Sequence, residues 1–483
     1  MMGVVKIGYL YRHNYSAFIC ISICLFLSCA PRANRWGLPQ YEYTYQAPEK
    51  IDDDWETSDL EAEGVDPKKI IELMENILKG DIKNIHSILL VKNGKLIFEE
   101  YFYGYDRDTT HFQASVSKSI TSILVGIAID QKLAPDVKTK VYNLFSKHKD
   151  TKWIYQKYPI ALQHLLTMTA GVDWDAYKYP RSNPLQTTHQ MYDSKDPVEF
   201  VLERNAVEAP GIKFNYNSGL TILLGEVIKN TSGMYIDEFS GKFLFRPLGV
   251  SNFYWDKFPN GTVQTDGGLH LRPRDMAKIG YMMLKNGKWR GQQIVSKEWV
   301  IESTKAHTTH DLGYGYQWRS VKITINNKEI DMFWASGHGG QRIFVIPTLD
   351  LIAVFTSKVF GNPLGGFRPA GILKHYIIPS MLPPAPSRKT IKLDPKIVDR
   401  YVGKYKLNLS DVPLIILRKG DKLFIPTPYR EFVELLPESE YRFFGISKEF
   451  GDAQLDFTKD AKGNIQKVII HIGFGQIRCE KIE

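Results

Sequence analysis

The sequence of 483 residues contains little cysteine. Of its four cysteines, Cys20, Cys24 and Cys29 lie near the N-terminus, and only Cys479 lies beyond them. A lone cysteine has no partner in its own chain for a disulfide, and it cannot supply the several thiolates of a structural zinc site. We therefore expect neither an internal disulfide nor a cysteine-rich metal site beyond residue 29.

Several widespread binding and catalytic motifs are also missing. The sequence has no Gly-x-Gly-x-x-Gly, Walker-type or EF-hand pattern, which argues against the corresponding nucleotide and calcium sites. It has no Gly-x-Ser-x-Gly elbow, which argues against an α/β-hydrolase. His307, His310 and Asp311 stand close together, but in a polar loop rather than on a helix. We therefore predict no metal and no cofactor.

The charge of the chain is only mildly unbalanced. Lys and Arg number 62 against 53 Asp and Glu, which gives a formal net charge of +9. These charges are spread along the chain, and no basic module with interleaved aromatic residues accompanies them. We therefore predict that the protein has no nucleic-acid partner.

Residues 1–29 have the pattern of an export signal. Basic residues precede an apolar run over residues 17–28, which is too short to span a bilayer and is typical of a secretory h-region. The run ends in Phe-Leu-Ser-Cys, which resembles a bacterial lipoprotein signal that is cleaved before a lipid-carrying Cys29. We expect export to the bacterial cell envelope or periplasm and a lipid anchor at Cys29. An ordinary cleaved signal and an uncleaved anchor are the alternatives.

The rest of the chain divides by composition. Residues 30–65 contain scattered prolines and many Tyr, Asp and Glu, and we predict an extended tether there. Residues 381–391 are a Pro-rich linker. Residues 392–483 read as short alternating strands separated by turns, which predicts a small all-β barrel or sandwich.

The region between tether and linker, residues 66–380, combines strands at its ends with helices between them. Two β-rich runs around Asn93-Gly94 predict a hairpin, and a second hairpin is predicted over residues 342–355. Between them, helical patterns cover residues 160–171, 220–228 and 275–284. We predict an α+β fold in which one antiparallel sheet is built from distant segments, with flanking helices and an inserted helical lobe.

Ser115 and Lys118 form the strongest catalytic signal. They stand three apart, and the apolar run over residues 120–129 predicts a buried helix that begins at Ser115. Burial disfavours the charged form of a lysine, so the amine of Lys118 becomes available as a base beside the Ser115 hydroxyl. A second Ser-x-x-Lys pair, Ser146 and Lys149, lies in a charged stretch without such a helix and is read as a solvated turn.

Two further stretches carry residues that could meet Ser115. Tyr216 lies in the polar stretch Phe-Asn-Tyr-Asn-Ser-Gly before another buried helix, and a tyrosine there could shuttle a proton or simply pack in a turn. His338 begins the stretch His-Gly-Gly-Gln at the second hairpin. Glycines allow a substrate to approach the backbone closely, and a backbone N–H there could join that of Ser115 in an oxyanion hole.

In this order, the three stretches resemble the motifs of the serine β-lactamase and penicillin-binding-protein superfamily. The nearest similarity is to its esterase, D-aminopeptidase and 6-aminohexanoate-dimer-hydrolase-like branch, over residues 66–380. The resemblance implies that Ser115 is the acylated nucleophile, Lys118 its general base and Tyr216 the catalytic tyrosine. It places His338, Gly339 and Gly340 at the Lys-Thr-Gly motif, with the N–H groups of Ser115 and Gln341 as the oxyanion hole.

The departures from the superfamily motifs concern substrate binding. His338, Gly339 and Ser218 stand where β-lactamases have residues that contact the substrate, and we assign Ser218, Gly339 and Gly340 to the substrate site. Each lost hydrogen bond to a charged group is worth roughly 1.5–3 kcal/mol, so we predict poor β-lactamase activity. The sequence favours a serine hydrolase acting on an ester, amide or peptide. A D,D-peptidase acting on peptidoglycan and a catalytically silent envelope scaffold are the alternatives.

Overall fold

The computed structural model describes residues 42–148, 150–155, 159–175, 183–308, 312–359, 365–407, 410–426, 432–448 and 450–482. Thr44–Glu483 is one compact unit, distinct from Met1–Tyr43. The predicted export signal and Cys29 lie outside the described residues. None of the helices in the described ranges combines the length and the apolar character that a membrane crossing requires.

The central element is a sheet of eight strands assembled from segments far apart in the sequence, as predicted. In spatial order the strands are β1 (Glu56–Thr57), β3 (Lys95–Tyr101), β2 (Ile85–Lys92), β13 (Leu351–Ser357), β12 (Gln341–Ile346), β11 (Lys328–Gly337), β10 (Arg319–Ile325) and β9 (Gly313–Tyr314). All neighbours are antiparallel except β1 and β3. The predicted Asn93-Gly94 turn joins β2 to β3, and both of its residues have positive φ, as a tight hairpin requires.

Helices cover both faces of this sheet. On one face, α8 (Pro273–Leu284) packs on β2, β12 and β13, and α2 (Val116–Asp130) contacts β11 and β12. The close contact of α8 depends on Gly280, where a Cβ would lie 2.8 Å from methyl groups of Ile343 and Ile352. On the other side lie α1 (Pro67–Leu78) and α10 (Arg368–Ile372), followed by a π-helical turn over Leu373–Ile377 that contacts α1.

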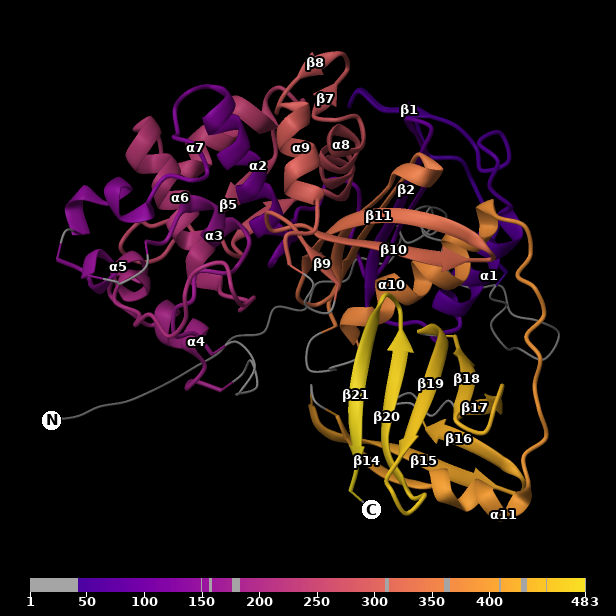
Figure 1. Ribbon diagram of the computed structural model, residues 1–483. Helices are drawn as coiled ribbons and strands as arrows, with labels where there is room; N and C mark the ends of the chain where they lie inside the picture. Colours follow the sequence, from indigo (N-terminus) through magenta and orange to yellow (C-terminus); the bar gives the residue numbers. More distant parts are fainter. Residues whose placement is uncertain are drawn as a thin grey trace, which may run out of the picture. The chain divides into compact units, whose positions relative to one another are not determined.

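The inserted lobe contains short helices around two long ones (Figure 1). The long helices are α2 and α6 (Ser218–Ser232), and the short ones are α3 (Leu162–Leu166), α4 (Thr187–Tyr192), α5 (Pro197–Leu202) and α7 (Ile236–Ser240). Helix α9 (Lys297–Thr304) packs on α2, and a small sheet joins β4 (His111–Phe112), β6 (Leu269–Leu271) and β5 (Phe253–Trp255). Almost every residue of α2 is buried, as its apolar sequence predicts.

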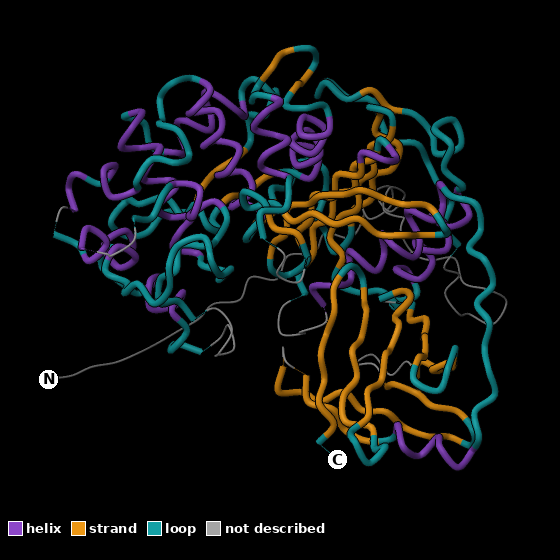
Figure 2. Tube along the Cα trace, viewed as in Figure 1, coloured by secondary structure: helices purple, strands orange, loops and turns teal. Residues whose placement is uncertain are grey.

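The C-terminal region forms a closed antiparallel barrel (Figure 2). Its strands are β14 (Gly403–Leu407), β15 (Ser410–Lys419), β16 (Lys422–Pro426), β17 (Phe432–Pro437), β18 (Arg442–Ser447), β19 (Gly451–Lys459), β20 (Ile465–Ile472) and β21 (Gly475–Lys481). It has its own core of alternating inward side chains, which includes Cys479, and α11 (Pro395–Val398) packs at one end. Of the two predicted forms, barrel and sandwich, the barrel is the correct one.

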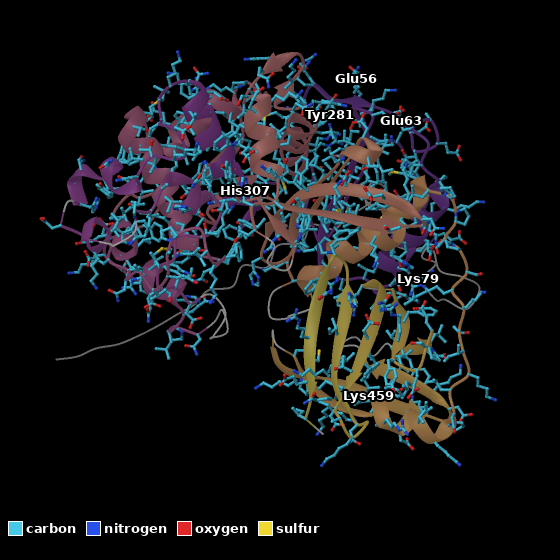
Figure 3. All side chains as sticks on the ribbon, viewed as in Figure 1. Glu56, Glu63, Lys79, Tyr281, His307 and Lys459 are labelled. Carbon is cyan, nitrogen blue, oxygen red and sulfur yellow. The ribbon has the colours of Figure 1, made fainter. Side chains whose placement is uncertain are left out.

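The predicted tether over residues 30–65 is wrong for the part that the structure describes. Trp55 is buried against α8, and β1 adds to the edge of the sheet. Glu63, labelled in Figure 3, accepts hydrogen bonds from Lys95 Nζ (2.8 Å) and Asn93 Nδ2 (2.9 Å). These bonds lower the pKa of Glu63 to about 2. One large aromatic side chain and one paired carboxylate therefore fasten a segment whose average composition is that of a linker.

The helix predicted over residues 160–171 is also shorter than expected. Helix α3 ends at Leu166, because Met168 takes a positive φ of 59° and Gly171 one of 69°. A positive φ cannot continue a right-handed helix. The chain instead turns at Met168, whose carbonyl accepts the N–H of Asn215. The turn thereby brings residues 167–171 against the stretch that carries Tyr216.

Two histidines form a buried pair close to the start of α2. His86 Nδ1 lies 2.9 Å from His111 Nε2, and the His86 ring stacks on Tyr105 with a centroid separation of 4.2 Å. Burial, followed by the charges of His111 and Lys358, lowers the pKa of His86 to about 4. Burial also lowers the pKa of His111. Both rings are therefore neutral in the folded protein near neutral pH.

This pair predicts a loss of stability in mild acid. Below about pH 6.5 the unfolded chain binds a proton at His86, whereas the folded chain does so only near pH 4, so the free energy of unfolding should fall by roughly 3 kcal/mol across this window. Thermal melts between these pH values would measure the loss. His86→Gln should melt with a weaker pH dependence, and an unchanged dependence would assign the loss to other groups.

Candidate functional site

Ser115 begins helix α2 in a strained turn. The preceding residue, Ala114, has a φ of 47°, which is rare for a residue with a Cβ, and Ser115 itself is the half-buried N-cap. The Ser115 side chain makes no capping hydrogen bond. Its Oγ lies 3.3 Å from Lys118 Nζ, one turn further along the helix. The helix start therefore presents a hydroxyl beside an amine, as the Ser-x-x-Lys spacing predicts.

Lys118 is almost completely buried, with 2% of its surface exposed. Besides Ser115 Oγ, its amine donates to Ser218 Oγ at 3.2 Å and to the backbone carbonyl of Asp266 at 2.5 Å. The carboxylate Oδ2 of Asp266 lies 3.7 Å away. A buried ammonium is costly unless it is paired and hydrogen-bonded, and these contacts supply both.

The Tyr-Asn-Ser stretch meets Lys118 at the start of α6. The Lys118 amine lies 5.4 Å from the centroid of the Tyr216 ring. Asn217 is buried and accepts the Leu220 N–H as the N-cap of α6. Ser218, the first residue of the helix, contacts the amine directly. The structure thus brings Tyr216 and Ser218 to the Ser115–Lys118 pair, and Ser218 contacts the predicted base.

The third predicted stretch forms the turn between β11 and β12. His338 is exposed at this turn, and Gly339 and Gly340 follow with φ of 81° and 101°. A Cβ at Gly340 would lie 2.0 Å from Ser357 Oγ, so only glycine fits there. Gly337, the last residue of β11, lies directly against the residues that precede Ser115. A Cβ added at Gly337 would lie only 2.3 Å from the Gln113 carbonyl oxygen.

Gln341, predicted as an oxyanion-hole donor, lies on an inner strand of the sheet. Gln341 begins β12, which lies between β11 and β13, and its amide side chain bonds to the backbone of Ser357. Its backbone therefore lies between two other strands rather than at an open edge. The Gly337 carbonyl faces the turn and accepts the Gly340 N–H. Backbone N–H and C=O groups point to alternate sides along a strand, so those of Ser336 point away from β12, toward the β10 side of β11. The pairing of β10 with β11 ends at Trp334, so β10 does not cover this side of β11 beyond that residue.

Asp266 and Tyr192 are site residues that the sequence did not predict. The Tyr192 hydroxyl donates to Asp266 Oδ2 at 2.8 Å, on the carboxylate that faces Lys118. Asp266 is separated from Lys118 by 148 positions, so no spacing rule links the two residues. The sequence of residues 266–268, Asp-Gly-Gly, does not show where this carboxylate points.

Two arginines near Tyr216 were also not predicted. Arg342 is 9% exposed and donates to the carbonyls of Gly337 and Gly366, each at 2.6 Å. Burial and the nearby positive charge of Arg319 lower the pKa of Arg342 to about 9, while Tyr216 opposes this shift. Arg319 lies over the Tyr314 ring, 5.7 Å from its centroid. Arg342 is therefore within electrostatic range of both Arg319 and Tyr216.

Metal-binding clusters are absent from the part of the chain that the structure describes: no group of three His, Cys, Asp or Glu side chains could hold an ion. His307, labelled in Figure 3, stacks on Tyr316 and bonds to the Glu302 carbonyl. It borders a polar cavity of about 260 Å³ together with His164. The two residues that stand close to His307 in the sequence, His310 and Asp311, lie outside the described residues.

Two family models match most of the chain. Residues 83–376 match the family model described as Beta-lactamase, and residues 387–481 match a domain of unknown function, DUF3471. The chain is 25% identical over 240 residues to the 6-aminohexanoate-dimer hydrolase of Paenarthrobacter ureafaciens, a match that covers 44% of this chain and 55% of that relative. The match therefore spans only about half of that relative's length.

Solved structures share the fold at lower identity. The octameric penicillin-binding protein homologue from Pyrococcus abyssi aligns with a TM-score of 0.53 at 19% identity, covering 85% of this chain and 99% of that one. EstCE1, a hydrolase with promiscuous acyltransferase activity, aligns with a TM-score of 0.50 at 16% identity, covering 61% and 93%. At this identity the likeness concerns the fold alone.

The contact between Gly337 and the nucleophile segment makes a prediction. In Gly337→Ala the new methyl group would overlap the Gln113 carbonyl, so β11 and the start of α2 must separate, and we expect at least a tenfold loss of ester hydrolysis. Gly366→Ala is the matched control, because its Cβ would meet nothing closer than 3.9 Å. Equal rates in both variants would show that this contact does not matter for activity.

Proposed function

Because this chain belongs to the Beta-lactamase family, we propose that it is a serine hydrolase that forms an acyl-enzyme at Ser115 on an ester or amide substrate. The family is one of hydrolases, and relatives bear the names 6-aminohexanoate-dimer hydrolase and hydrolase with promiscuous acyltransferase activity. One observation carries the proposal: a buried lysine amine lies 3.3 Å from the hydroxyl of a serine at a helix start, and this hydroxyl makes no capping hydrogen bond.

The reaction follows from these contacts. Ser115 Oγ attacks the carbonyl carbon as its proton passes to the Lys118 amine, which needs an unprotonated lone pair at that moment. Tyr216, 5.4 Å from the same amine, gives a proton to the leaving oxygen or nitrogen and recovers one from Lys118. A water molecule then attacks the acyl-enzyme by the reverse proton path and releases the acid.

For the developing oxyanion we propose two backbone N–H groups. One belongs to Ser115, whose position at the helix start leaves its N–H without an intrahelical acceptor. The second comes from the open edge at the end of β11, from Ser336 or His338, rather than from Gln341. Support comes from the strand alternation and from the contact of Gly337 with the Gln113 carbonyl. Exposed His338 then acts through its backbone, and Gly339 and Gly340 shape the turn.

Two alternative functions can be distinguished by experiment. A D,D-peptidase acting on peptidoglycan peptides would use the same nucleophile, and digestion of muropeptides without ester hydrolysis would favour it. A silent envelope scaffold would not label with a fluorophosphonate. We further propose, from the sequence signal alone, that the protein is exported and carries a lipid at Cys29, and that it turns over β-lactams poorly because the residues that hold their carboxylate are changed.

The proposed function makes a prediction about the nucleophile. Ser115→Ala should lower the hydrolysis of a short-chain p-nitrophenyl ester at least a thousandfold, the order expected when a nucleophile is removed. Ser122→Ala, a buried serine of the same helix, is the matched control and should keep a rate near that of the parent protein. Equal rates in the Ser115→Ala and parent proteins would exclude Ser115 as the nucleophile. Fluorophosphonate labelling decides between a silent scaffold and narrow specificity if neither protein hydrolyses the ester.

The second prediction concerns substrate charge. Arg342 is within electrostatic range of Tyr216 and of Arg319, so an ester whose acyl chain ends in a carboxylate should be preferred over a neutral ester of equal length. Arg319→Gln should lower the ratio of the two kcat/KM values about tenfold, the effect of roughly 1.4 kcal/mol. Arg442→Gln, on the barrel and paired with Asp456, is the control and should leave the ratio unchanged. An unchanged ratio in Arg319→Gln would refute the prediction.

A further inference from the structure

The environment of Asp266 is unusual for a carboxylate. The residue is 2% exposed, and its Oδ2 accepts the Tyr192 hydroxyl at 2.8 Å and faces Lys118 Nζ at 3.7 Å. Its other oxygen, Oδ1, is buried without a hydrogen-bond partner in the described part of the protein. A buried carboxylate usually has its oxygens bonded, because an unbonded one costs free energy. The carboxylate therefore faces the predicted base through Oδ2, while its second oxygen, Oδ1, offers a further acceptor position that no described group uses.

The loop that carries Asp266 is held firmly between the two long helices. Thr121 of α2 donates to the Thr265 carbonyl at 3.1 Å, and Thr265 Oγ1 donates to the Thr221 carbonyl of α6 at 2.7 Å. On its other side the loop lies against the nucleophile segment, since a Cβ at Gly267 would lie 4.0 Å from the Ala114 carbonyl carbon. The position of Asp266 relative to Lys118 is thus set by both helices.

The hydrogen bonds of Lys118 create a problem for its proposed role. Its amine points at three oxygens, those of Ser115, Ser218 and the Asp266 backbone. An ammonium has three protons and no lone pair, so it fills these three positions but cannot accept the Ser115 proton. Before Ser115 attacks, Lys118 must lose a proton. The groups that face its amine are Ser115 from its own helix, Tyr216 and Ser218 from the start of α6, and Asp266 with Tyr192 behind it.

We propose that Asp266 is a positioning residue that stores the proton of Lys118 during the reaction. The inference rests on the proposed function and adds one step to it. A small movement of the amine toward Oδ2 lets an N–H bond break and an O–H bond form, which turns the charged pair into a neutral amine and a carboxylic acid. The amine lone pair then takes the Ser115 proton as the bond from Oγ to the carbonyl carbon forms.

The pair returns to its first state when the cycle ends. Once Lys118 has passed the Ser115 proton to the leaving group through Tyr216, it takes its own proton back from Asp266. No net charge enters or leaves the buried site, which avoids the cost of an unpaired ion there. Tyr192 holds the Asp266 carboxylate in place by its hydrogen bond, and its own ring packs edge-on against Phe258, with 5.4 Å between the ring centroids.

The test compares Asp266→Asn with Asp256→Asn between about pH 6 and 9.5. Asp266→Asn keeps the shape of the side chain but offers no carboxylate, so Lys118 must give its proton to solvent. We expect a loss of about 100-fold in kcat near pH 7, within the range of a general acid–base contribution, and a deficit that shrinks as the pH rises. Asp256→Asn, bonded to His270 at 3.1 Å, should follow the parent profile.

A merely structural role would lower the rate of Asp266→Asn by the same factor at every pH, and that result would overturn the inference, as would a parent-like profile. If Asp266→Asn does not fold, as judged by its melting temperature, Tyr192→Phe replaces it and should show a smaller loss with the same pH trend. Fluorophosphonate labelling separates the two proposals: if Ser115 of the parent protein neither labels nor hydrolyses esters, the proposed function itself fails.

Discussion

The burial of one amine, that of Lys118, organises the site. An ammonium taken out of water costs several kcal/mol unless neighbouring groups replace its hydration. Here the replacements come from three separate segments: the start of α2, the start of α6 and the loop at Asp266. Because all three must meet at one atom, the helical lobe has to close around α2. The threonine bonds from Thr121 and Thr265 show the same convergence one turn further in.

Much of the fold could be predicted from the sequence because its signals are local. The Asn93-Gly94 turn predicts its hairpin from two residues that accept positive φ. The apolar run after Ser115 predicts a helix that is buried on all sides, and the alternating C-terminal strands predict a barrel that the structure closes. The proximity of Ser115, Lys118 and Tyr216 could be predicted because each lies inside a short motif. In each case, the information lies within about ten residues.

The features that the sequence did not predict depend on contacts between distant residues or on a shift of one residue along a strand. Trp55 fastens the supposed tether because α8 provides a place for it, and no local signal shows that. Asp266 meets Lys118 only after the loop is placed between α2 and α6. The replacement of Gln341 in the proposed oxyanion hole has a different reason. The predicted motif begins in the turn after β11, whereas the residues that reach the open edge precede it, and alternation reverses at each step along a strand.

The site also separates reaction chemistry from substrate choice. Ser115, Lys118 and the α6 start form a compact group fixed by both long helices, so changes there would disturb several buried contacts at once. Arg319 and Arg342 instead lie on strands β10 and β12, and Arg342 is within electrostatic range of Tyr216. Arg319 contacts only an aromatic ring among the described contacts, so its replacement would disturb little else. Under the proposed function, a fold built this way keeps one acyl-transfer reaction and alters its substrates by substitutions on the strands, so family membership alone does not identify the substrate.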